Sequence, residues 1–522
     1  MRTSVATVAV LVAATALVAP AFPQTPNELA VGAGGSAHAP LVKLRVHPSS
    51  GVVLLGDRMA RDNTDSSFDF VSAVCPDCGG PCPPVSRTVE VTLAANTAVA
   101  GGYGVSNLVN SNYTVTNVSY STQGPLTDGQ QLVITIVGDV IDCGTWFNVW
   151  FSVCDQAPLA WDDPCPVVTL LYEFAGTDGQ WPAWESMTIS GSTLYGTTQR
   201  GGSSNEGVVF ALGTDGSGFT PLHQFAGYTT GDGSYPLSNL VVTGSTLYGA
   251  TSNGGTWDSG TVYAVDLDGN NYRQIHVFRQ TDGAYPQGGL TLSGSTLYGT
   301  AYEFGTYFNG VIFKVDTDGN NFAVLRHFQG GASDGNSPAA PLVLDGSTLY
   351  GTTTNGGPDP SYGVVFSIGT DGNGFTLLHT FDGSDGFGPY GLTLVGNTLY
   401  GVTVVGGANN GGVLYSMGTD GNGFTVLRHF AGGVSDGLRP YGALTLSGST
   451  LFGMTYDGGN SDAGVIFSIR TDGGGFALLH EFVGGVDDGS TPDGSLTLSG
   501  SVLYGGTRLG GDSNKGVIFR LE

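Results

Sequence analysis

Histidines are the residues of this chain best suited to bind a metal or act as general bases, and there are eight of them. Six lie in short β-rich segments that recur along the last two thirds of the sequence. Four of the six stand two residues before a phenylalanine, where Arg326, Arg428 and Tyr172 stand in other copies of the segment. The copies are too far apart to share a metal, so we predict structural roles. The residues are His223, His276, His379 and His480 at the shared position, with His327 and His429 one residue later.

Aspartates form a second recurring set, in the motif Asp-Gly-x-x-Pro. Hard cations prefer several oxygen ligands, so a ring of these carboxylates would be a weak candidate for calcium binding. We favour the simpler interpretation, in which the aspartate caps its own turn and the proline fixes the entry to the next strand. No cofactor is expected. The aspartates are Asp178, Asp232, Asp282, Asp334, Asp385, Asp436 and Asp488.

Residues that depart from the repeat are better candidates for function, because a repeated residue usually reflects architecture. The departures cluster in the loops that flank the first strand and follow the second strand of each repeat. Many are aromatic side chains, which suit a sugar ring or a protein partner, although each could equally pack within its own loop. The ligand-binding candidates are Trp181, Trp184, Tyr235, Trp257, Tyr285, Tyr302, Tyr307, Tyr390, Arg439 and Tyr441.

A pair of carboxylates is the remaining chemistry to consider, since glycoside hydrolysis needs two acidic side chains and no sequence motif. Glu185 and Asp493 would lie on neighbouring repeats if the array closes into a ring. Carboxyl separations of about 5–5.5 Å or about 6.5–9.5 Å would indicate a retaining or an inverting glycosidase. The chain has no Gly-x-Ser-x-Gly, His-Glu-x-x-His or phosphate-loop motif. We therefore favour a non-catalytic protein, with a polysaccharide hydrolase or lyase as the alternative.

The positions of these residues follow from a repeat, because the chain contains seven copies of one sequence unit. The tripeptide Leu-Tyr-Gly, once Leu-Phe-Gly, recurs at steps of 50 to 53 residues. Each unit of about 51 residues contains four short β-rich runs, and an Asp-Gly pair, a type I′ hairpin signal, separates the third run from the fourth. This pattern predicts an all-β fold, a seven-bladed β-propeller over residues 167–522. The aromatic residues of the tripeptides are Tyr195, Tyr248, Tyr298, Tyr350, Tyr400, Phe452 and Tyr504.

The two ends of the array predict how the ring closes. The last unit stops after its third strand, and Val167–Phe174 matches the fourth-strand segment Phe476–Phe482. We expect this N-terminal strand to complete the last blade, which would leave only short protected sheet edges.

The first part of the chain has a different character. Residues 1–21 have the apolar run and small residues of a signal peptide, residues 22–37 form a linker, and residues 38–166 predict a small disulfide-containing β domain, sandwich-like in its strand pattern. A metal site at the CxxC is the less favoured alternative, and 15 disulfide pairings are open. The six cysteines are Cys75, Cys78, Cys82, Cys143, Cys154 and Cys165.

Composition limits the partners of this protein. A formal net charge of −26 would repel nucleic acid and anionic membranes, so neither is an expected partner. Only 11% of residues are charged, while 87 are glycine, which is typical of many short strands punctuated by turns.

The repeats resemble the GloVer, or choice-of-anchor, tandem repeats of exported bacterial proteins. The resemblance rests on Leu349–Thr353 (Leu-Tyr-Gly-Thr-Thr), on Gly356-Gly357 and on Gly363–Phe366, and covers residues 167–522. It implies an exported protein, often tethered at the cell envelope, and brings no catalytic residues. We expect a secreted or extracytoplasmic monomer, in the periplasm or outside the cell, with no membrane insertion after signal cleavage. It would act as a binding, adhesion or scaffold module for polysaccharide or protein at the cell exterior.

Overall fold

A computed structural model describes the backbone of eight strands between Val42 and Asp155, and residues 168–522 except 183–185, 360 and 434–435. Two compact units divide the chain, Met1–Val167 and Val168–Glu522. The signal segment, the linker and the side chains of all six cysteines lie outside the described residues, so the signal-peptide and disulfide predictions stay predictions. Within the described part of the chain, no helix is long and apolar enough to cross a membrane.

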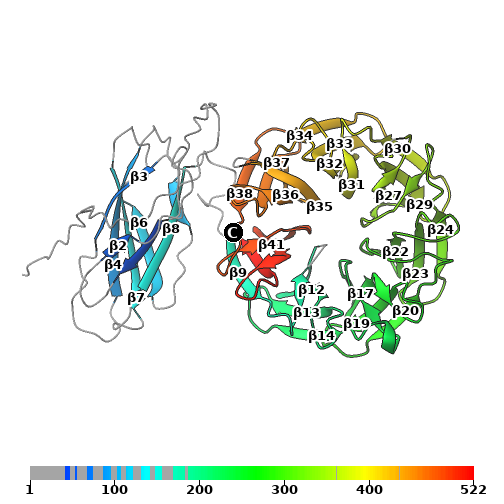
Figure 1. The fold of residues 1–522 in the computed structure, drawn as a ribbon, viewed down its shortest axis with the longest axis horizontal. Coiled ribbons are helices and arrows are strands. Elements are labelled where there is room, and N and C mark those ends of the chain that lie inside the picture. The colour runs from blue at the N-terminus through cyan, green and yellow to red at the C-terminus, as the bar shows by residue number, and fades with distance from the viewer. Residues whose placement is uncertain are drawn as a thin grey trace, which may run out of the picture. The chain divides into compact units, whose positions relative to one another are not determined.

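The described strands of the first unit form two antiparallel four-stranded sheets (Figure 1). One sheet has the order β2 (Val53–Leu55), β1 (Val42–Val46), β8 (Phe147–Asp155), β5 (Tyr103–Ser106). The other has the order β3 (Phe68–Val74), β4 (Ser86–Ala95), β7 (Gln131–Val140), β6 (Tyr113–Tyr120).

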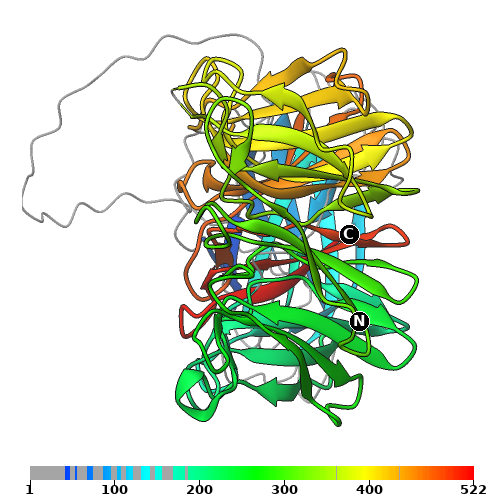
Figure 2. The same cartoon turned by 90° about the vertical axis from the view of Figure 1, so that its right-hand side faces the viewer.

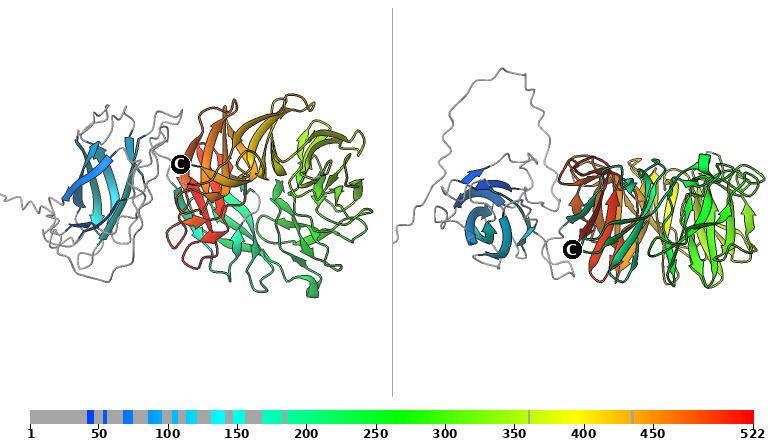
Figure 3. Two further views of the ribbon diagram at one scale, coloured as in Figure 1. Left: turned by 45° about the horizontal axis from the view of Figure 1, so that its top comes forward. Right: turned by 90° about the horizontal axis from the view of Figure 1, so that it is seen from below.

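The second unit is a seven-bladed β-propeller, which confirms the repeat-based prediction. Each blade contains a four-stranded antiparallel sheet, with its first strand nearest the axis and its fourth at the rim (Figure 1). Figure 2 and the right panel of Figure 3 show the propeller from its side. The first three blades are β11 (Thr188–Ser190), β12 (Thr193–Arg200), β13 (Val208–Gly213), β14 (Thr220–Gln224); β16 (Val241–Thr243), β17 (Thr246–Thr251), β19 (Thr261–Asp266), β20 (Arg273–Val277); and β21 (Thr291–Ser293), β22 (Thr296–Ala301), β23 (Val311–Asp316), β24 (Ala323–His327).

The remaining blades follow the same order. They are β26 (Val343–Asp345), β27 (Thr348–Thr353), β29 (Val364–Gly369), β30 (Thr376–Thr380); β31 (Phe387–Val395), β32 (Thr398–Val405), β33 (Val413–Gly418), β34 (Thr425–His429); β35 (Gly437–Ser447), β36 (Thr450–Gly458), β37 (Val465–Arg470), β38 (Ala477–Glu481); and β40 (Thr497–Ser499), β41 (Val502–Thr507), β43 (Val517–Leu521), β9 (Val168–Glu173).

The ring closes as the sequence predicts. Strand β9, the first of the propeller in sequence, pairs antiparallel with β43 as the outer strand of blade seven. A second joint lies near the axis, where Thr497 Oγ1 donates a 2.7 Å hydrogen bond to the carbonyl of Met187 in blade one. The same threonine-to-carbonyl bond joins other neighbouring blades, as from Thr393 to Leu444. Backbone pairing at the rim and side-chain bonds near the axis thus close the ring without disulfides.

The repeated Leu-Tyr-Gly has a packing explanation. Its glycine pairs across the sheet with an aromatic residue of the third strand, as Gly196 does with Phe210. A Cβ at position 196 would lie 2.6 Å from the Phe210 ring, so a larger residue would displace the aromatic core of the blade. The preceding leucine is fully buried in every blade, as Leu194 is in the first. The same packing constraints apply in each of the seven blades, and they explain why the Leu-Tyr-Gly motif recurs.

The hairpins between third and fourth strands lie where the Asp-Gly pairs predict, but the predicted type I′ turn is wrong. Gly216 has φ 87°, whereas Asp215 is not among the residues with positive φ. Gly216 N donates to Gly213 O, and Gly213 N donates to Ser217 O. This pattern is a type I turn followed by a left-handed glycine, the three-residue hairpin with a G1 bulge. Asp215 stabilises it by accepting from Ser217 N.

Candidate ligand-binding face

The Asp-Gly-x-x-Pro aspartates hold the turns that join successive blades. Asp232 accepts hydrogen bonds from the backbone N–H groups of Ala226 and Gly233, and lies 3.1 Å from His223 Nε2. Burial acts to raise the pKa of Asp232, but its hydrogen bonds, including one from Tyr272, outweigh that effect and lower it. These contacts are the ones expected if the aspartate caps its own turn. No group of three or more His, Cys, Asp or Glu side chains gathers as metal ligands among the described residues, and calcium binding stays a prediction.

Each aspartate pairs with the rim residue that the sequence singled out. The pairs are Tyr172 with Asp178, His223 with Asp232, His276 with Asp282, Arg326 with Asp334, His379 with Asp385, Arg428 with Asp436, and His480 with Asp488. Six of these rim side chains also stack on an aromatic ring of the next blade, as His223 does on Tyr272 at 3.5 Å between ring centroids. At the seventh joint, after His480, Val168 takes the place of the aromatic residue.

The last two histidines of the recurring segments stabilise loops. His327 Nδ1 accepts from Thr306 N at 3.1 Å, and His429 Nδ1 accepts from Ala408 N at 3.0 Å. All six histidines of the propeller therefore have structural contacts, in agreement with the predicted structural role.

Two sets of loops form one face of the propeller, as the sequence predicts. Short strands pair the loop before each first strand with the loop after the second strand of the same blade. Examples are β10 (Gln180–Pro182) with β12, and β15 (Gly233–Ser234) with β18 (Asn253–Gly254). Tyr302 N donates to Tyr285 O in blade three, where the same two loops meet. We call this surface the loop face.

A strained backbone position recurs on the loop face. The residue before the proline of every Asp-Gly-x-x-Pro motif has a positive φ, yet only one of the seven is glycine. A left-handed conformation is costly for bulky side chains, and such residues often mark functional positions. The seven residues are Trp181, Tyr235, Tyr285, Ser337, Gly388, Arg439 and Thr491. Three of the predicted ligand-binding aromatic residues thus occupy this position, on three consecutive blades.

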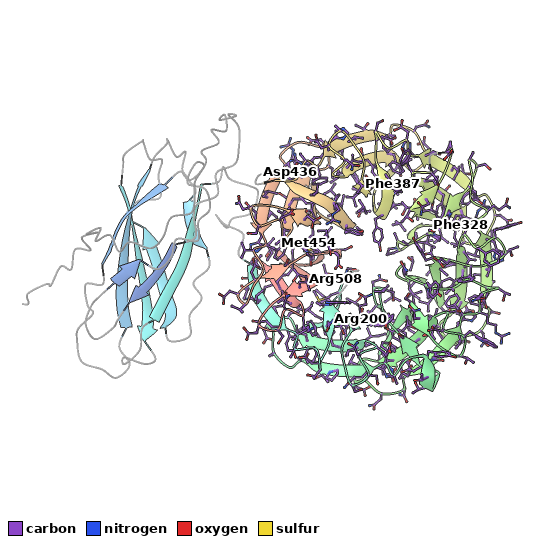
Figure 4. The ribbon with its side chains drawn as sticks, in the orientation of Figure 1. Arg200, Phe328, Phe387, Asp436, Met454 and Arg508 are labelled. Carbon is purple, nitrogen blue, oxygen red and sulfur yellow. The ribbon has the colours of Figure 1, made fainter. Side chains whose placement is uncertain are left out.

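Arginine and aromatic side chains alternate where blades seven, one and two meet. The guanidinium carbon of Arg508 lies 4.6 Å from the Trp181 ring centroid. That of Arg200 lies 5.5 Å from the Trp181 ring centroid and 4.5 Å from that of Tyr235. Both arginines lie at the inner side of the ring, whereas Asp436 lies at its outer side (Figure 4). We call Arg508, Trp181, Arg200 and Tyr235 the cation–aromatic row.

The two arginines are not among the sequence-predicted candidates, although the sequence carries a signal for them. They occupy the two positions that follow the segment Leu-Tyr-Gly-x-x of each unit, Arg508 at the first and Arg200 at the second. The other units have uncharged or acidic residues at these positions, such as Ser252, Asn253 and Glu303. A comparison of charge between equivalent loop positions, rather than of aromatic content, would have found them.

Asp493 is buried close to this row, at 2% exposure. Neither of its carboxyl oxygens has a hydrogen-bond partner. Burial raises its pKa to about 8, against the smaller opposing effect of Arg508. Its proposed catalytic partner Glu185 lies outside the described residues, as does Trp184, so the carboxyl separation stays untested. The chemistry shown is a carboxyl group held largely protonated at neutral pH.

Blades five and six place other candidates in packing contacts. Tyr390 is only 5% exposed and packs edge-on against Tyr441 at 5.5 Å. Arg439 forms an ion pair with Asp457 and lies over the Tyr456 ring at 4.8 Å. Tyr302 packs against the hydrophobic cluster that contains Tyr390. Burial raises the pKa of Tyr441. The Arg439 side chain is 43% exposed.

Blades two and three carry the most exposed aromatic side chains of the loop face. Trp257 is 57% exposed, Tyr307 47% and Phe308 70%. Phe304 and Phe308 have φ of 64° and 63°. Five other blades place asparagine or aspartate at the position of Phe308, where its side chain accepts from a backbone N–H of the same loop. The two phenylalanines are also absent from the sequence-predicted set, and the loss of this repeated Asn or Asp is the signal for Phe308.

The sequence pattern of the Gloeobacter/Verrucomicrobia repeat matches residues 227–397 and 361–522, so the chain belongs to this repeat family. This agrees with the resemblance noted from the Leu-Tyr-Gly-Thr-Thr and Gly-Val-Val-Phe motifs. No curated protein matches the chain.

Solved structures are similar to the chain only at low identity and with TM-scores below 0.5. An oligogalacturonate lyase from Vibrio parahaemolyticus is 11% identical, with a TM-score of 0.46, and the match covers 80% of this chain and 98% of the lyase. TolB from Acinetobacter baumannii is 16% identical, with a TM-score of 0.34, covering 52% and 58%. A chain of a nidogen/laminin complex is 16% identical, with a TM-score of 0.35, covering 53% and 91%. At these scores the likenesses assign no activity.

Proposed function

We propose that this member of the repeat family is an exported, non-catalytic module that binds a carbohydrate chain on the loop face. The observation that carries the proposal is the exposure of Trp257, Tyr307 and Phe308 on two adjacent blades. Exposed aromatic side chains on neighbouring loops are candidates for a ligand-contact surface. Flat aromatic surfaces with nearby polar groups suit the apolar faces of sugar rings.

Backbone strain at this surface supports the same proposal. Phe308 adopts a left-handed conformation that the asparagine or aspartate of other blades adopts at lower cost, and it loses the capping hydrogen bond that they make. Phe308 has one aromatic contact, edge-on with Phe304 at 5.9 Å between ring centroids, and stays 70% exposed. A residue that costs stability and buries so little of its ring is better explained by function than by folding.

Retention of the purified protein on insoluble polysaccharides tests this function. We expect at least one polymer to retain the protein and Phe308→Asn to weaken that retention, because asparagine restores the repeat residue and removes the ring. Arg470→Ala is the control, since the Arg470 side chain is 54% exposed but lies in a hairpin between a third and a fourth strand, outside the loop face. No retention on any polymer, or equal loss in both variants, would contradict the proposal and favour a protein partner.

A polysaccharide hydrolase or lyase is the second candidate, favoured by one observation. Asp493 has a pKa of about 8 because of burial, as a general acid requires. Release of reducing ends, measured in the same samples, separates the two functions. Release that Asp493→Asn abolishes would establish the enzyme, and retention without release would support the binding module.

A further inference from the structure

Arg200, in the cation–aromatic row, has no acidic partner among the residues that the structure describes. The buried Nε of Arg200 has no hydrogen-bond partner, and no carboxylate of the described residues forms an ion pair with its guanidinium. The chain has 43 acidic residues against 17 basic ones, so most of its basic side chains could have an acidic partner. Arg326 and Arg428 at the rim each have one, in Asp334 and Asp436.

Aromatic rings hold the Arg200 guanidinium in place before any ligand binds. The guanidinium of Arg200 lies near both the Trp181 and Tyr235 rings, and Trp181 is itself held through its backbone N–H, which donates to Lys515 O at 2.8 Å. A guanidinium already held by aromatic rings loses little freedom when it binds an anion, and its planar fork matches carboxylate and sulfate oxygens. Arg508 adds a second guanidinium on Trp181.

Asp493, the buried acid that interacts with Arg508, carries little negative charge at neutral pH. Burial raises the pKa of Asp493 to about 8, so its carboxyl group is largely uncharged at pH 7. Asp457, in the neighbouring blade, is already paired with Arg439. Among the described residues, Arg200 therefore has no acidic partner, in a protein whose total charge is strongly negative.

We infer that the ligand of the loop face is an anionic polysaccharide, and that Arg200 binds a carboxylate or sulfate group of a sugar whose ring packs against Trp181 or Tyr235. This inference rests on the proposed carbohydrate-binding function and narrows its ligand class. Because the protein as a whole repels polyanions, retention on such a polymer would require a specific site rather than general charge attraction.

Matched polymers test the inference. The purified protein is applied to alginate, to alginate with its carboxyl groups esterified, to dextran sulfate and to dextran. We expect retention on alginate or dextran sulfate, weaker retention on the uncharged counterpart, and elution by added salt. Elution with free glucuronate or with inorganic sulfate then distinguishes the carboxylate from the sulfate source.

Variants assign the effect to Arg200. Arg200→Gln is expected to weaken anionic retention about tenfold or more, since a charge-assisted hydrogen bond is lost, and Arg200→Lys to weaken it less. Arg470→Gln is the control, because Arg470 is an exposed arginine paired with Asp472 in a rim hairpin. Thermal unfolding checks that each variant folds. If Arg200→Gln does not fold, the retention of Arg200→Lys on the anionic polymers tests the inference.

Three results would overturn the inference in distinguishable ways. Retention on neutral polymers only, or anionic retention that both Arg200 variants leave unchanged, would refute the anionic ligand while leaving carbohydrate binding in place. Retention on none of these polymers or of the wider panel would refute the proposed function together with the inference.

Discussion

Glu173 Oε2 accepts a 2.8 Å hydrogen bond from the backbone N–H of Asp512, although 339 residues separate them in sequence. Glu173 ends β9, and Asp512 lies in the loop before β43, so the bond extends the strand pairing that closes the ring. The first strand of the propeller therefore belongs to its last blade, and the fold is complete only when both ends of the array are present.

Deletion of residues 168–174 should open the ring. Without β9, the edge of β43 loses its backbone partners and becomes available to other chains. We expect a lower thermal unfolding temperature and higher-order species in size-exclusion chromatography. Deletion of the N-terminal unit up to residue 165 is the control, because it keeps β9. An unchanged melting temperature with monomeric elution of the shorter chain would contradict this account of closure.

The contacts between neighbouring blades predict that two substitutions of Arg428 reduce stability by different amounts. Its guanidinium pairs with Asp436 and lies 3.3 Å from the Phe476 ring centroid of the next blade. Arg428→Ala should destabilise the protein by about 2–3 kcal/mol, because it leaves a buried carboxylate without its partner. Arg428→His should cost less, since histidine fills this position in four blades and stacks in three of them. Urea unfolding measures both variants, and equal losses would contradict the shared role.

The sequence predicts the architecture because seven copies repeat the same constraints. Gly196 facing Phe210, and Asp232 facing His223, recur in equivalent form, so period and pattern reveal them without coordinates. The Asp-Gly pair locates each hairpin but does not determine its type, because the dipeptide fits both a two-residue and a three-residue loop.

The site was only partly predictable for a physical reason. Trp181 and Tyr235 are visible as aromatic departures, but Arg200 gains its role from rings that belong to different blades. Such a contact depends on how neighbouring blades meet, which no single repeat encodes. Burial also separates the candidates: Tyr390 and Trp257 look alike as loop aromatics, yet one is buried and the other exposed.

Phe308→Asn should stabilise the protein and weaken its binding to polysaccharide. Asparagine adopts the left-handed conformation at lower cost, and its Oδ1 should accept from Phe304 N, as Asn205 accepts from Gly201 N. We expect a gain of about 1 kcal/mol in the free energy of unfolding, with weaker retention on polysaccharide. Asn205→Phe in blade one is the reciprocal variant and should lose a similar amount. A less stable Phe308→Asn protein would show that the ring contributes to folding.

Asp493 predicts how stability depends on pH. Its pKa is about 8 in the folded protein because of burial, against an ordinary value of 3.8. Between these values the folded state binds more protons than the unfolded state, so this group's contribution is fully present below about pH 4 and is lost as the pH rises toward 8. Each pKa unit corresponds to about 1.4 kcal/mol, so the loss is large enough to measure.

Asp493→Asn and Asp493→Leu test this directly through urea unfolding at several pH values. The first removes the titration, and the second places leucine where Leu237 stands in blade two. The stability of both variants relative to the natural protein should rise from pH 4 to pH 8, since neither must expel a buried charge. Asp472→Asn, at an exposed hairpin, should show no such rise over this range. Parallel stability curves for Asp493→Asn and the natural protein would mean that Asp493 ionises at an ordinary pH in the folded state, which would also remove the main support for a general acid on the loop face.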